Sequence, residues 1–101
     1  MPKKSIRDIH NIHLRDPAVA SEYLNEAFAS GEQDVILMAV RNVVEAQEGG
    51  VASVAKRAHI GRESMYKMLS ATGNPKLTSL AALFHGIGLQ LCVKPEDNHL
   101  N

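Results

Sequence analysis

Apolar residues recur at helical spacing in three successive segments of this chain, and Gly or Pro separates each segment from the next. The first segment begins at Asp16-Pro17, a pair that has the pattern of an N-cap followed by proline at the first helical position, and Gly31 is its expected end. Its apolar positions fall at i, i+3, i+4, i+7 and i+8, namely Ala20, Tyr23, Leu24, Ala27 and Phe28. This periodicity predicts an all-α fold.

The rest of the chain predicts further helices, about five in all. A helix over residues 34–47 is apolar around much of its circumference, so it is expected to be central to the core. Two short helices, 51–58 and 62–69, follow with only three residues between them. Asn74 is expected to cap a last helix that opens at Pro75, carries Leu77 on its apolar face and closes near Gly86.

The two ends of the chain have different patterns. Apolar and polar residues alternate over Leu89–Val93, which predicts a short C-terminal strand paired with its own copy across a two-fold axis or with Ile12–Leu14. Residues 1–15 are interpreted as an N-terminal arm or short edge strand, whose apolar residues need a partner surface. Three roles remain open for its segment Ile6–Leu14: a disordered arm, a strand of the dimer or the element that binds a toxin. A single domain is thus expected over residues 16–94, with a helix-turn-helix at 51–70 and a polar tail at 95–101.

Length and composition exclude several classes of protein. A chain of 101 residues is too short for a large two-domain enzyme. Its longest apolar run, Val35–Val40, cannot span a bilayer, and its polar N-terminus lacks a signal peptide's apolar region. The single Cys92 suits a reducing cytoplasm. No phosphate-binding loop, metal-ligand cluster or nucleophile–base set is present, so neither catalysis, a cofactor nor a metal is expected.

Charge is unevenly distributed along this neutral chain. The 11 Lys and Arg residues balance the 11 Asp and Glu residues overall. Residues 51–76, however, carry a net charge of +4, from Lys56, Arg57, Arg62, Lys67 and Lys76 against Glu63. This segment is therefore where an anionic partner is expected to bind.

The helix expected at 62–69 divides into two faces. At roughly 100° per residue, Met65, Met68 and Leu69 fall together on one side. The opposite side collects polar and cationic residues: Glu63, Tyr66, Lys67 and Ser70, with Arg62 and Ser64 at the N-terminal end. Such a face suits a helix lying in the major groove of DNA.

These residues resemble a known family. The stretch 51–70, with the small Ala55 at its fifth place, is similar to the helix-turn-helix of phage repressors. A wider stretch, from Tyr23 to Leu91, resembles the antidote proteins of HigA-like addiction modules. Two motifs carry this wider resemblance, Arg62–Leu69 and Gly73-Asn74-Pro75.

The resemblance implies a lambda-repressor-like, DNA-binding fold and an antitoxin. Such a protein neutralises a RelE/ParE-like toxin and, as a homodimer, represses its own promoter at a pseudo-palindromic operator. Two positions depart from the family pattern: His59 stands where Gly is usual, and Ala52 where a capping Ser is common. The candidate DNA-binding residues are Ser53, Arg62, Glu63, Ser64, Tyr66, Lys67, Asn74 and Lys76, the last two near phosphates.

Some alternatives remain open at this point. Glu63 either accepts a hydrogen bond from a cytosine or pairs with Lys67 at i+4. The chain as a whole is an antitoxin, a stand-alone prophage-type repressor without a toxin, or an interaction module with a vestigial motif. A toxin, if present, is expected to bind outside the recognition helix.

Overall fold

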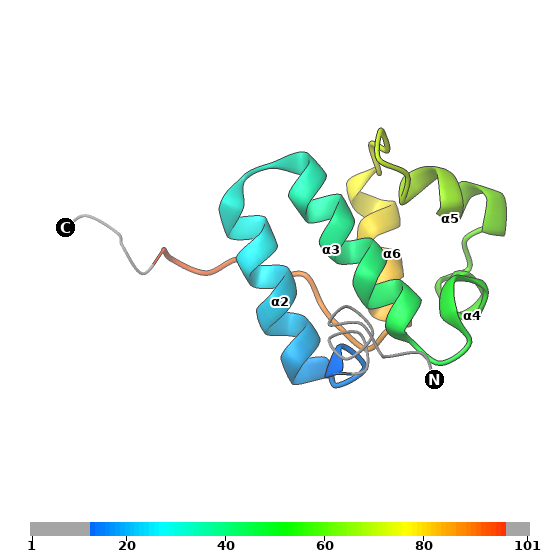
Figure 1. The fold of residues 1–101 in the computed structure, drawn as a ribbon, viewed down its shortest axis with the longest axis horizontal. Helices are drawn as coiled ribbons and strands as arrows, with labels where there is room; N and C mark the ends of the chain where they lie inside the picture. The colour runs from blue at the N-terminus through cyan, green and yellow to red at the C-terminus, as the bar shows by residue number, and fades with distance from the viewer. Residues whose placement is uncertain (1–12, 97–101) are drawn as a thin grey trace, which may run out of the picture.

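A computed structural model describes residues 13–96 of the chain, and every regular element in this range is helical (Figure 1). The expected all-α architecture is therefore confirmed for this range. Figure 1 shows α4 and α5 at one end of the molecule and α2 at the other, with α3 and α6 between them. The helices are α2 (Pro17–Ser30), α3 (Gln33–Ala46), α4 (Gly50–Ala58), α5 (Arg62–Met68) and α6 (Leu77–Gly86).

Helix α2 begins and ends where its sequence predicts. The Asp16 carboxylate accepts a hydrogen bond from the Ala18 backbone N–H at 2.9 Å, and Pro17 is the first helical residue. At the other end, Gly31 has φ +71°, a left-handed conformation that glycine adopts without steric cost. Both ends of α2 are therefore determined by local chemistry.

Helix α3 supplies the centre of the core. Its residues Val40, Val43 and Val44 are completely buried, and each such side chain contributes about 1.5–3 kcal/mol through removal from water. Asn42 on the same helix donates a hydrogen bond of 2.8 Å to the Tyr23 hydroxyl on α2. The expectation of a central second helix is confirmed.

Helices α4 and α6 approach each other closely. A Cβ atom added to Gly86 would lie 3.2 Å from the Cβ atom of Ala58. Small residues at this contact let the two backbones come together, and they bring Leu83 and Phe84 of α6 into the core.

The start of α6 differs from the prediction. The helix begins at Leu77, with Lys76 in the N-cap position, so Asn74 and Pro75 belong to the preceding loop. Leu77 is 74% exposed rather than buried. The position of Leu77 in the sequence places it on the same side of α6 as the buried apolar residues. No other helix within residues 13–96 covers the first turn of α6, however, so the Leu77 side chain stays exposed.

The predicted C-terminal strand is not seen in the part of the chain that the structure describes. Residues 89–93 have no regular secondary structure, and no other segment within residues 13–96 pairs with them. Alternation alone cannot make a strand, because the ladder hydrogen bonds need a second strand. Leu14, part of the other candidate strand, instead lies in a turn and is fully buried in the core. Residues 1–12 of the expected arm and residues 97–101 of the expected polar tail lie outside the described residues.

No helix within residues 13–96 is long and apolar enough to cross a membrane.

A three-residue turn joins α4 to α5, and its first residue is left-handed. His59 has φ +57° and ψ +39°, the only positive φ among the non-glycine residues that the structure describes. The His59 N–H donates to Lys56 O at 3.2 Å, and the Ile60 N–H donates to Ala55 O at 2.9 Å. These two hydrogen bonds form a Schellman motif, which ends α4 and redirects the chain. Histidine tolerates the left-handed conformation better than most residues, so it can stand where glycine is usual.

The left-handed turn should respond to substitution in opposite directions. We expect His59→Gly to raise the free energy of unfolding by up to about 1 kcal/mol, because glycine removes the steric cost of this conformation. His59→Val should lower it by about 1–2 kcal/mol. Ala81→Gly, at an exposed helical position in α6, serves as control and should lower it by about 1 kcal/mol. Urea unfolding followed by circular dichroism measures all three, and a less stable His59→Gly variant would contradict the argument.

Candidate nucleic-acid interface

Helix α5 presents two chemically distinct faces, as its sequence predicts. Met65, Met68 and Leu69 are buried against the core. Ala55 of α4 is also buried, and its small side chain leaves room for α5 to cross close by. The five candidate residues on the outer side of α5 are all exposed: Arg62, Glu63, Ser64, Tyr66 and Lys67.

Side chains from α3 hold the far end of α5 and the loop after it. Arg41 donates a hydrogen bond from Nε to the Leu69 carbonyl at 2.9 Å. Gln33 donates from Nε2 to the Gly73 carbonyl at 2.8 Å. Both bonds satisfy backbone oxygens that the end of a helix and an irregular loop otherwise leave unpaired. The exposed face of α5 is therefore fixed to the most buried helix of the molecule.

Gly73 sets the path of the loop that follows α5. A Cβ atom at this position would clash with the Met68 carbonyl oxygen and lie 3.0 Å from the Lys67 carbonyl oxygen. Only glycine permits so close an approach of two backbone segments. The loop consequently folds back on the C-terminal end of α5, which brings residues 74–76 next to this helix.

A polar cleft of about 480 Å³ lies between α5, this loop and the start of α6. Four of the eight candidate residues line it: Ser64, Lys67, Asn74 and Lys76. The other four do not line it. Arg62, Glu63 and Tyr66 are exposed elsewhere on α5, and Ser53 is half-buried on α4 beside Gly49.

Three hydroxyl residues in the cleft were not among the candidates. Ser70, Thr72 and Ser79 line it together with the two lysines. Hydroxyl groups and lysines are among the groups that bind phosphate oxygens. The Ser70 hydroxyl already donates its hydrogen to the Lys67 carbonyl oxygen at 2.9 Å, so Thr72 and Ser79 are the hydroxyl groups left to donate. Ser70 and Thr72 lie close together in the sequence, and this clustering could have identified them as candidates. Ser79 reaches the cleft only because of how α6 packs, so no pattern in the neighbouring sequence predicts its role.

The cations near α5 are not neutralised by neighbouring carboxylates. Lys56, Arg57, Arg62, Lys67 and Lys76 are all exposed, and none makes an ion pair within residues 13–96. Glu63 likewise makes none there, so the pairing with Lys67 that its spacing allows is not formed. This surface is therefore able to attract a polyanion.

The described part of the chain offers little for metal chemistry. Within it, no three His, Cys, Asp or Glu side chains gather into a group that could hold a metal ion. Cys92 is a free, exposed thiol.

Comparison with known proteins gives two matches. Residues 7–95 match a protein family described as "Probable addiction module antidote protein". A protein of Haemophilus influenzae described as "Uncharacterized protein" is 32% identical over 82 residues, which cover 81% of this chain and 82% of the relative. No solved structure matches. Because the family match extends over most of its length, the chain belongs to the family of probable addiction module antidote proteins.

Proposed function

We propose that this protein is an antitoxin that neutralises a RelE/ParE-like toxin and, as a homodimer, represses its own operon by sequence-specific DNA binding. The observation that carries the DNA-binding part is the exposed, polar and cationic face of α5, held rigidly by a buried apolar face. Family membership supports the antitoxin part. In this proposal α4 and α5 form a phage-repressor-type helix-turn-helix.

The two helices have different tasks in this arrangement. Helix α5 enters the major groove and presents Arg62, Glu63 and Tyr66 to base edges. The polar cleft beside it receives a phosphate of the DNA backbone through Lys67 and Lys76. Helix α4 crosses the backbone and supplies further cations, Lys56 and Arg57.

Glu63 fits this role as a base-reading residue. A carboxylate facing DNA is repelled by phosphates unless it accepts a hydrogen bond, and the N4 amino group of cytosine is the donor that the major groove offers. Its carboxylate is free of ion pairs within residues 13–96, so it is available to accept. Glu63 thereby favours operators with cytosine at the contacted position, while its negative charge lowers the affinity for DNA in general.

Single substitutions on α5 test the DNA-binding surface. We expect Arg62→Ala to cost about 1–3 kcal/mol of operator binding and to relax base preference if Arg62 binds guanine. Lys67→Ala should weaken binding to all sequences alike. Gel-shift titrations with the promoter fragment and a scrambled fragment measure both effects. Lys94→Ala, an exposed cation after α6, is the matched control. Wild-type affinity in both α5 variants would refute the docking.

Salt dependence tests the electrostatic part separately. A dimer offers ten cationic side chains from residues 51–76. A protein that makes about six to ten phosphate contacts loses roughly 10³–10⁵ in DNA affinity when salt rises from about 50 to about 200 mM. We therefore expect a steep fall in the association constant with added salt. Lys67→Ala should make the slope shallower by about one unit per lost contact. An association constant that does not change over this range would show that DNA is not the partner.

Growth assays test the antitoxin part. We expect that expressing the short reading frame adjacent to this gene arrests growth, and that co-expression of this protein relieves the arrest. Arg62→Ala should relieve it equally well, because toxin binding is proposed to lie outside α5. A harmless neighbour, or an arrest that persists, would instead favour a stand-alone repressor.

A further inference from the structure

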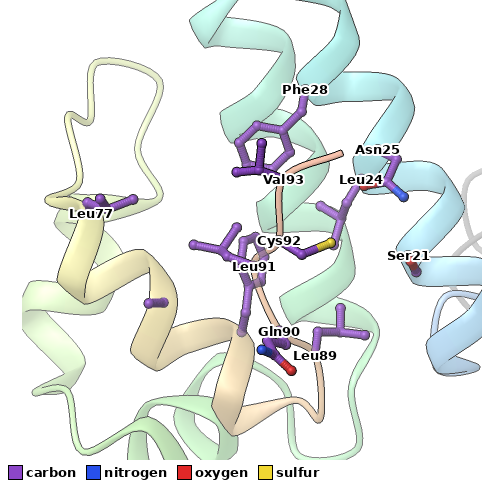
Figure 2. A pocket seen from close by; sticks show the side chains of 12 residues that line it. Ser21, Leu24, Asn25, Phe28, Leu77, Leu89, Gln90, Leu91, Cys92 and Val93 are labelled. Carbon is purple, nitrogen blue, oxygen red and sulfur yellow. The ribbon is translucent and has the colours of Figure 1, made fainter. Parts of the chain in front are cut away.

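A second depression lies away from α5, between α2, α6 and the segment after α6. This apolar groove has a volume of about 590 Å³. Figure 2 shows Phe28 of α2 and the side chains of Leu91 and Val93 around the same space, with Leu77 of α6 on the other side. None of the candidate DNA-binding residues lines it.

The groove exposes large apolar side chains. Phe28 is 37% exposed, Leu77 is 74% exposed and Val93 is completely exposed. Single exposed apolar residues are ordinary on a protein surface, but several that gather in one depression indicate a binding site. The Phe28 ring is held in place by an edge-on contact with the Phe84 ring, with 6.3 Å between their centroids. This contact fixes the wall of the groove that α2 and α6 form.

The stretch of chain that contains α2, one wall of the groove, is acidic. Between Asp16 and Val40 the chain carries five acidic residues and neither Lys nor Arg. All five are exposed, and within residues 13–96 none makes an ion pair. Glu22 and Glu26 lie on α2 itself, next in sequence to the groove residues Ser21 and Asn25. DNA would be repelled from this side, whereas a cationic protein surface would be attracted.

We propose that this groove binds the toxin, through a cationic amphipathic segment whose apolar side chains enter the groove while its Lys and Arg residues face the acidic side of α2. This inference rests on the antitoxin function proposed above and assigns the surface that performs it. An amphipathic helix lying in an apolar groove is a common mode of protein recognition. Because none of the candidate DNA-binding residues lines the groove, the same chain can bind toxin and operator together.

Two sets of variants separate the apolar and the charged contributions. Leu77→Ser with Val93→Ser removes apolar side chains that are already exposed, so the fold should be unaffected. Glu22→Lys with Glu26→Lys reverses the charge on α2. Met38→Ser, a half-exposed apolar residue of α3, and Glu48→Lys, an exposed acid of the α3–α4 loop, are matched controls that do not line the groove.

The readout is the dissociation constant for the purified product of the adjacent reading frame, measured by biolayer interferometry. We expect the apolar pair to weaken toxin binding at least about tenfold at any salt concentration. The charge-reversal pair should weaken it about tenfold at low salt and progressively less as salt is added. Both controls should bind the toxin as the wild type does, and the apolar pair and Met38→Ser should leave operator affinity unchanged.

Three results would overturn the assignment, and they are distinguishable. If the wild type binds the toxin but both variant pairs bind it equally well, the toxin lies elsewhere and the antitoxin function stands. If light scattering shows that the apolar pair has lost its dimer, the groove joins two copies of this chain instead. If the wild type itself does not bind the toxin, the proposed function fails together with the groove.

Discussion

The packing of α4 against three other helices is the contact on which the rest of the structure depends. Its inner face touches α3, α5 and α6, and small residues let all three come close. Ala55 and Ala58 are buried there, and Gly86 of α6 meets Ala58 directly. A larger side chain at these positions would separate the helices, and α5 would lose the orientation that the proposed function requires. The geometry of the proposed DNA-binding surface is therefore determined by buried residues that do not belong to that surface.

Local chemistry explains which parts of the fold could be predicted from the sequence. The ends of α2 and the left-handed turn at His59 depend on neighbouring backbone groups and on intrinsic conformational preference, so they were predictable. The two faces of α5 follow from helical periodicity alone. In each case, the information lies within a few residues.

The remaining features depend on contacts between distant segments. Asn74 and Pro75 have the pattern of a helix start, but Gly73 is tied to α5 and to Gln33, so α6 begins two residues later than Pro75. Apolar and polar residues alternate over residues 89–93 as in a strand, but no segment in the described part of the chain pairs with them. Leu91 lies beside the groove, a location set by how α2 and α6 pack rather than by its own neighbours. The polar cleft likewise gathers residues from three elements, of which the sequence indicated only some.

Gly73 has a thermodynamic consequence for recognition. Because its backbone lies directly on the end of α5 and its carbonyl is held by Gln33, the loop bearing Asn74 and Lys76 is already ordered in the free protein. A flexible loop would lose conformational entropy on binding, at a cost of about 1–2 kcal/mol for each backbone residue that becomes fixed. Here that entropy is lost when the chain folds. A partner that docks on this surface therefore meets groups that are preorganised, and more of the contact energy remains as affinity.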